Sequence, residues 1–229
     1  MSSTSSYHFS SEALIQSCPL PKSMISHKGR NNSSLTITAS KIEPLSGLLK
    51  RNKKHLKYQV VEQLISSIGR QLKYLERENK GISSFNLDDI TVFYPITRDD
   101  ADHADHAEPS QLSTIPLCYF AITNDEKIHD INDNNNLEII TPYPKEKTTT
   151  FHSPELTEFI SKKRIPYEIH FKSGYYSFGL LCLYCYVSRT AATATALEET
   201  LAPIINTKIY WFLKQVLQED PIERRFICV

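Results

Sequence analysis

Hydrophobic and polar positions recur along this chain with spacings that predict several helices. The clearest pattern covers residues 56–78, where apolar side chains return every three or four positions between Lys, Arg, Gln and Glu. Asn79 and Gly81 follow it, and both residue types tolerate the left-handed backbone that closes a helix. We therefore predict one long amphipathic helix in this region.

Three further helical segments are predicted in the second half of the chain. Residues 153–160 begin with Ser153 as an N-cap and Pro154 in the first turn. Residues 175–187 are apolar on every side, which is typical of a helix buried at the centre of a domain. An amphipathic pattern over residues 209–217 predicts the last helix.

Shorter elements are predicted between these helices. Strands are expected at residues 35–38, 90–93 and 114–122, and a short helix at residues 48–53. The Asn/Asp-rich residues 125–136 are expected to form a loop.

Two segments differ in composition from the rest and set the expected domain organisation. Residues 1–33 are Ser-rich with little periodicity, so we expect them to be poorly ordered. Residues 98–112 contain the near-duplication ADHADHAE and are expected to form a loop insertion. We expect the remaining residues, 34–229, to form one domain.

The balance of charges limits the classes of partner. Lys plus Arg and Asp plus Glu number 26 each, so a net charge of +0 offers no bulk attraction to nucleic acid or an anionic membrane. No apolar run approaches the roughly 20 residues that a spanning helix needs, and the N-terminus does not resemble a secretory signal. We expect a cytoplasmic or nuclear protein with no nucleic-acid partner and no membrane span. Its five cysteines, odd in number and scattered, are expected to be free thiols.

Four motifs occur in an order that resembles one known family. The run YLERENKGISSFNLDDITV at residues 74–92 is followed by the sequence SPE at residues 153–155, SGYYSFG at residues 173–179 and DPIERR at residues 220–225. In this order they resemble the catalytic-loop region, the APE motif, the start of the central helix and the arginine segment of protein kinases. Over residues 34–229 the chain resembles the C-terminal lobe of the protein kinase-like superfamily; the alternative is an unrelated helical domain.

The resemblance implies one structural ion pair. In protein kinases, the glutamate of the APE motif pairs with the arginine near the end of the domain. Glu155 and Arg224 are the matching positions here. Removing one partner of such a buried pair costs roughly 3–5 kcal/mol, so its presence implies that the lobe is still built.

The same resemblance implies that the chemical positions are degenerate. Ser84 stands where the family has the catalytic base Asp, Asn86 where it has Lys, and Asp89 where it has the metal-binding Asn. Tyr119 aligns with the Asp of the DFG motif, and Gly174 replaces the Asp that anchors the catalytic loop. A Ser hydroxyl is a poor base without a partner, and a Tyr offers magnesium no carboxylate. The resemblance therefore implies no catalytic residue, no cofactor and no metal.

The expected fold class depends also on the residues that precede the kinase-like region. Upstream of residue 34 there is no Gly-rich phosphate loop and no VAIK-type lysine. The resemblance then implies an α+β, mainly α, kinase-like C-lobe with a truncated or absent N-lobe. Such a lobe would expose an apolar face, and exposed apolar patches mark interaction sites.

The function implied by these features is that of a pseudokinase. Such a domain would be a scaffold or regulatory subunit that binds another protein, either a kinase or a subunit of a complex. One alternative is an atypical nucleotide-binding protein or kinase that uses Asp88 and Asp89; another is a degenerate product with no retained role.

Three other features have competing interpretations. Acidic residues around His103 and His106 suggest a metal site, although a solvated loop is the simpler interpretation. Cys182 and Cys185 form a CxxC within an apolar run, which favours buried core thiols over a redox or zinc site. The basic residues of 50–57 suit phosphates or acidic partners, or simply a solvated helix start.

Overall fold

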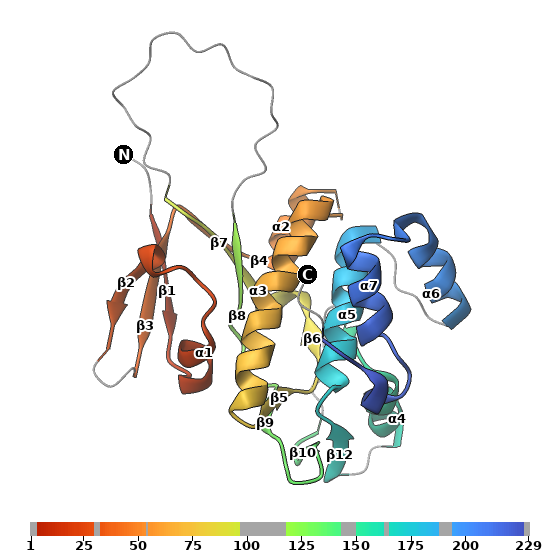
Figure 1. The fold of residues 1–229 in the computed structure, drawn as a ribbon. Helices are drawn as coiled ribbons and strands as arrows, with labels where there is room; N and C mark the ends of the chain where they lie inside the picture. Colours follow the sequence, from red (N-terminus) through yellow and green to blue (C-terminus); the bar gives the residue numbers. More distant parts are fainter. Residues whose placement is uncertain are drawn as a thin grey trace.

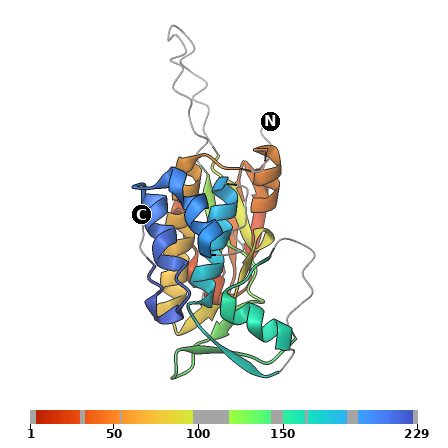
Figure 2. The same cartoon turned by 90° about the vertical axis from the view of Figure 1, so that its right-hand side faces the viewer.

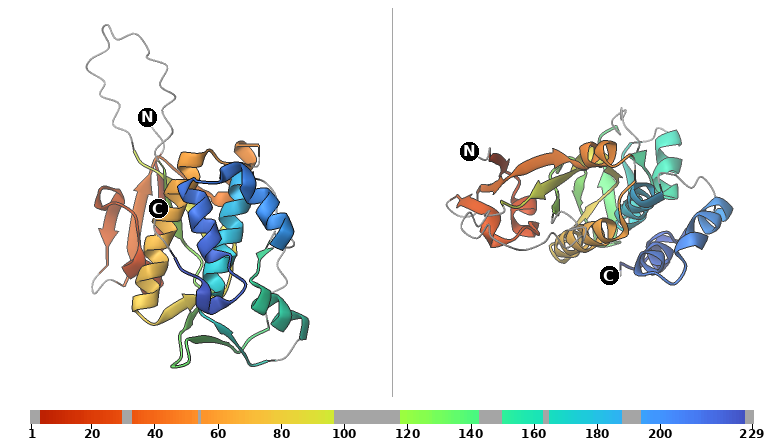
Figure 3. Two further views of the ribbon diagram at one scale, coloured as in Figure 1. Left: turned by 45° about the vertical axis from the view of Figure 1, so that its right-hand side comes forward. Right: turned by 90° about the horizontal axis from the view of Figure 1, so that it is seen from above.

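The computed structural model describes residues 4–29, 33–53, 55–96, 118–142, 150–162, 165–187 and 194–226. These residues form a mixed α+β fold in which helices lie along one side of several small antiparallel sheets (Figures 1 and 3). Among them, no helix combines the length and apolar character that crossing a membrane requires.

Three helices lie side by side and form the helical layer (Figure 2). They are α3 (Tyr58–Arg77), α5 (Ser173–Val187) and α7 (Lys208–Val216). The central helix α5 is largely buried because it packs against the other two, and its Phe178 ring contacts the rings of Phe85 and Phe212. All three predicted helices are confirmed within two residues.

The sheet beneath α3 contains the strands β4 (Lys41–Pro44), β7 (Ile90–Tyr94) and β8 (Tyr119–Ile122), in the order β4-β7-β8. Gln71 of α3 is fully buried against β8. Its amide oxygen accepts a hydrogen bond from the Ile122 N–H at 2.8 Å, and its amide nitrogen donates to the Ile122 carbonyl at 3.4 Å. Backbone groups at the edge of β8 are thus satisfied by a side chain of the helix that covers it.

The N-terminal residues also fold, so the expectation that residues 1–33 are poorly ordered is wrong for residues 4–29. They form β1 (Ser5–Phe9), α1 (Glu12–Ser17), the 3-10 helix η1 (Lys22–Met24) and β2 (Ile25–Lys28); with β3 (Leu35–Ala39), the strands make a sheet of order β1-β3-β2 (Figure 1). The physical reason is burial: Phe9, Leu14 and Ile15 join the main core, although the Ser residues around them hide the pattern.

The first strand of this N-terminal unit packs against β7 and β8. The Phe9 ring stacks on the Phe93 ring of β7 at a centroid distance of 6.4 Å, and the Tyr7 ring meets Phe93 edge-on at 5.7 Å. The Tyr7 hydroxyl donates to the Thr123 carbonyl at 3.4 Å, just beyond β8. The chain's own first strand therefore supplies an apolar cover for β7 and β8.

The remaining elements are short and surround this core. They are α2 (Leu45–Arg51), β5 (Lys80–Ile82), β6 (Phe85–Asn86), η3 (Leu87–Asp89), β9 (Ile128–Asp130), β10 (Asn136–Ile139), β11 (Thr150–Phe151), α4 (Pro154–Lys162), β12 (Tyr167–His170), α6 (Ala194–Leu201), η4 (Ala202–Ile204) and η5 (Pro221–Glu223). The region expected to be a loop, residues 125–136, contains β9, which pairs with β5. The predicted insertion at residues 98–112 lies outside the described residues.

Candidate functional site

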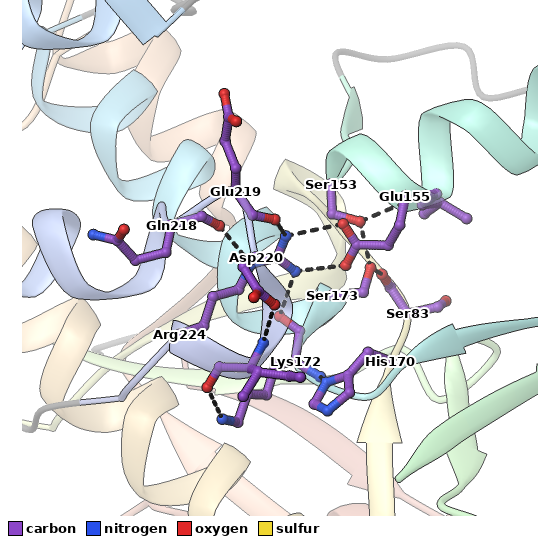
Figure 4. Close-up of polar contacts among 12 residues, drawn as sticks. Ser83, Ser153, Glu155, His170, Lys172, Ser173, Gln218, Glu219, Asp220 and Arg224 are labelled. Atoms are coloured by element: carbon purple, nitrogen blue, oxygen red, sulfur yellow. Dashed lines mark hydrogen bonds and ion pairs between the residues drawn. The ribbon is translucent and has the colours of Figure 1, made fainter. Parts of the chain in front are cut away.

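Arg224 and Glu155 meet in a buried ion pair (Figure 4). The guanidinium is bidentate: Nη1 donates to Oε1 at 2.5 Å and Nη2 donates to Oε2 at 2.9 Å. Its other N–H groups donate to the carbonyls of Gln218 at 2.8 Å, Glu219 at 2.9 Å and Lys172 at 3.3 Å. Arg224 has no exposed side-chain surface, and all five of its donors have partners. The sequence analysis paired these two residues, and the structure brings them together.

This ion pair joins elements that are far apart in the sequence. Glu155 lies in the first turn of α4, whereas Arg224 follows η5 and lies over the ring of Tyr176 in α5, 4.8 Å from the ring centroid. Burial raises the pKa of the Tyr176 hydroxyl, and the charge of Arg224 partly opposes that rise. Burial and the charges of Lys172 and Arg224 lower the pKa of His170 nearby. These contacts support a structural role, because the Arg224 guanidinium has no exposed surface and both carboxylate oxygens of Glu155 accept its hydrogen bonds.

Two serines at the start of α5 attach this helix to the loop that the resemblance identifies as the catalytic loop. Ser173 Oγ donates to the Ser83 carbonyl at 2.8 Å and lies 2.7 Å from Ser153 Oγ, the cap of α4 (Figure 4). Ser177 Oγ accepts a hydrogen bond from the Phe85 N–H at 2.6 Å and donates to a backbone carbonyl of β11. Both hydroxyls are buried, so they anchor the loop without a carboxylate.

Gly174 lies between these two serines and allows a close approach of backbones. A Cβ atom at this position would come within 2.2 Å of the Ile82 carbonyl oxygen. There is therefore no room for the Asp that the family has at this position. The contacts of Ser173 and Ser177 with this loop were not anticipated from the sequence.

Asp89 is the centre of a second buried polar cluster. Its Oδ2 accepts a hydrogen bond from the Asn86 N–H at 2.8 Å and lies 3.1 Å from Lys127 Nζ. Its Oδ1 accepts a hydrogen bond from Asn124 Nδ2 at 2.9 Å. The side chains of Asp89 and Lys127 are 5% and 8% exposed, so this is an interior ion pair.

The neighbouring polar positions of this loop are occupied by internal contacts. The Asn86 side chain caps η3 by accepting hydrogen bonds from the N–H groups of Asp88 and Asp89 at 2.9 and 3.0 Å. Asp88 accepts a hydrogen bond from the Ser46 hydroxyl, and Ser84 is fully buried. The Asn86 and Asp89 side chains therefore hold this loop in shape as a reciprocal capping box.

Tyr119 does not join this cluster. It is the first residue of β8, opposite Phe93, whereas the residue that reaches Asp89 from the end of β8 is Asn124. The structure therefore does not bring Tyr119 and Asp89 together.

Lys127 and His152 are the members of this region that the sequence analysis missed. Burial lowers the pKa of His152 to about 4, with a further contribution from the positive charge of Lys127. Lys127 sits in an Asn/Asp-rich run that favoured a solvated loop, and His152 precedes the Ser153 cap as an isolated residue. Neither position carries a signal that sequence spacing alone would reveal.

Two predictions remain, one for the cysteines and one for His103 and His106. Cys182 and Cys185 are fully buried, and burial raises the pKa of both thiols, which confirms the interpretation as core residues. Within the described ranges the cysteines are free, and no group of three or more His, Cys, Asp or Glu residues could hold a metal ion. His103 and His106 lie outside those ranges.

No protein-family model matches this sequence, and no curated protein matches it.

Proposed function

We propose that this chain is a catalytically inactive, protein kinase-like domain that acts as a scaffold or regulatory subunit by binding another protein. The buried pair of Glu155 and Arg224 supports the kinase-like interpretation, because the resemblance required these two distant residues to meet. The helix α5, buried between α3 and α7, agrees with the role of a central helix.

The observation that carries the loss of catalysis is the environment of Asp89. Phosphoryl transfer requires metal ions between the phosphates and a group that orients the attacking hydroxyl. Here the carboxylate of Asp89 faces the ammonium of Lys127, and Ser84 has no exposed surface. A cation entering this site would have to displace Lys127, and a substrate hydroxyl would meet a buried serine.

The rival function, nucleotide binding through Asp88 and Asp89, gains no support from the geometry. Asp89 is engaged by Asn86, Asn124 and Lys127, and Asp88 by Ser46. The buried Asp89 carboxylate is therefore engaged at both oxygens, whereas the exposed Asp88 carboxylate accepts one hydrogen bond, at Oδ1.

The start of α7 exposes apolar side chains that could contact a partner. Trp211 of α7 and Ile205 just before it are each 54% exposed. Tryptophan is among the residues most enriched at interaction hot spots, and a large aromatic ring exposed on a helix is costly in water. We propose that this end of α7 is part of the binding surface.

Thermal unfolding with ATP and magnesium tests the lack of nucleotide binding. At about 100 times its dissociation constant, a ligand adds roughly 2.7 kcal/mol to stability, a shift of several degrees. We expect no shift. A magnesium-dependent shift that Asp89→Ala abolishes would overturn the proposal in favour of a working nucleotide site.

Affinity capture with matched variants tests the scaffold role. The bait is the full chain, compared with Trp211→Ser and with Ile140→Ser, a control at an apolar residue that is 69% exposed beyond β10. We expect a protein retained by the wild type and Ile140→Ser to be lost with Trp211→Ser. Equal retention by all three baits would remove Trp211 from the binding surface.

A further inference from the structure

Two segments, the turn before η3 and the β8–β9 connection, supply donors to the carboxylate of Asp89. Asn86 precedes η3, Asn124 follows β8, and Lys127 lies just before β9. Each supplies one donor to Asp89, at distances between 2.8 and 3.1 Å. In addition, the Asp89 carbonyl accepts a hydrogen bond from the Thr123 N–H at 2.9 Å. The β8–β9 connection is thus tied to one residue through both its backbone and its side chains.

The backbone of Lys127 extends this attachment to a second loop. Its carbonyl accepts a hydrogen bond from the Ser83 N–H at 3.1 Å, while its side chain reaches Asp89. Ser83 in turn accepts from Ser173 of α5 through its carbonyl. Lys127 therefore links the β8–β9 connection to the loop that α5 anchors.

Burial sets Lys127 apart from an ordinary surface lysine. Taking an ammonium and a carboxylate out of water costs several kcal/mol per ion, and only close pairing with further hydrogen bonds repays that cost. Holding the four-carbon side chain in one conformation costs up to roughly 2 kcal/mol more. The Lys127 side chain is only 8% exposed, so its pairing with Asp89 has to offset these two costs.

We propose that the Lys127 ammonium is a built-in cation that locks the β8–β9 connection in a single position, and that the Asp89 carboxylate becomes a binding site for a small ammonium ion once Lys127 is shortened. This inference is independent of the proposed function, because it concerns how the loop is held and not whether a partner binds.

Chemical rescue of a truncated lysine tests the proposal. Lys127→Ala removes three carbons and the nitrogen, the atoms of n-propylammonium. Since breaking a buried pair is strongly destabilising, we expect the melting temperature to fall by roughly 10 °C. n-Propylammonium should restore part of that loss in Lys127→Ala and leave the wild type unchanged.

Two controls separate charge from simple cavity filling. Propan-1-ol has the same carbon chain without the charge and should not rescue Lys127→Ala. In the double variant Asp89→Asn/Lys127→Ala the ammonium has no carboxylate to meet, so its effect should disappear. Rescue by the alcohol, or equal rescue of the double variant, would overturn the proposal, as would the absence of rescue by n-propylammonium.

Hydrogen exchange gives a second readout of the lock. Amides of residues 123–130 should exchange faster in Lys127→Ala than in the wild type and slow again with n-propylammonium. If Lys127→Ala does not fold, refolding from urea with n-propylammonium against the same concentration of sodium chloride replaces the melting experiment. Recovery of the circular dichroism signal with the ammonium alone supports the site, and equal failure with both salts overturns it.

Discussion

Arg224 shows how much a single buried side chain depends on its partner. Its five N–H groups have carbonyl or carboxylate acceptors, and only Glu155 among them supplies a negative charge. Glu155→Ala leaves the guanidinium buried without that charge, so we expect a loss of about 3–5 kcal/mol in the free energy of unfolding, measured in urea. Glu158→Ala in the same helix is the control; its side chain is 60% exposed in a pair with Lys162, and the change should stay within about 0.5 kcal/mol. Equal losses in the two variants would contradict a structural role for the pair.

At Gly174 the packing requires that there is no side chain. Gly174→Ala would bring Cβ within 2.2 Å of the Ile82 carbonyl oxygen, a backbone atom that cannot rotate away. We expect a loss of about 1–3 kcal/mol, as for other overpacked interiors. Gly47→Ala in α2 is the control, because its nearest atom would be 3.5 Å away; it should be neutral or stabilising. Thermal melts of both variants check the difference.

The lowered pKa of His152 predicts that the stability of the fold depends on pH. Burial, aided by the charge of Lys127, lowers its pKa from 6.5 to about 4. The unfolded chain therefore binds a proton that the folded chain rejects, and stability is lost as pH falls from about 6.5 toward 4. Urea titrations at several pH values should show a shallower loss in His152→Gln than in the wild type. Parallel curves would show that His152 does not titrate in this window.

At the scale of elements, β1 and α1 are as much part of the core as the predicted helices. Phe9 contacts Phe93 of β7 and is 2% exposed, so Phe9→Ala should cost about 3–5 kcal/mol in urea unfolding. Ser6→Ala on the same strand faces solvent and should have little effect. Indistinguishable midpoints would mean that the N-terminal strand is not packed as described.

The long elements were predictable because their burial repeats with a regular period. The helix pattern of residues 56–78 matches α3 closely, and the apolar run that became α5 was recognisable as a buried helix. The first strand, β1, was not, since Tyr7 and Phe9 stand among Ser and His in the short run SSYHF. Of the two polar clusters, the ion pair of Glu155 and Arg224 followed from a resemblance. The pairing of Asp89 with Lys127 depends on a loop path that local sequence does not encode.

At the scale of the whole molecule, most buried residues belong to one core that runs from Phe9 to Phe226. A second, smaller cluster lies between α4 and the β10/β12 pair and contains Leu137, Ile139, Leu156, Tyr167 and Ile169. Small units with few buried contacts open at lower free energy than the main core. We expect native-state hydrogen exchange to be faster for the amides of β10 and β12 than for those of α3 and α5. Equal protection would show that the two cores open together.

The exposed ring on α7 has an optical consequence. Trp211 is the only tryptophan of the chain, so all indole fluorescence comes from one half-exposed position on the proposed binding surface. A partner that covers this surface would remove water from the indole and move its emission to shorter wavelengths, whereas a ligand bound elsewhere would leave the spectrum in place. The protein thus carries its own label at the surface where a partner is proposed to bind, and an unmodified sample can report both the event and its location.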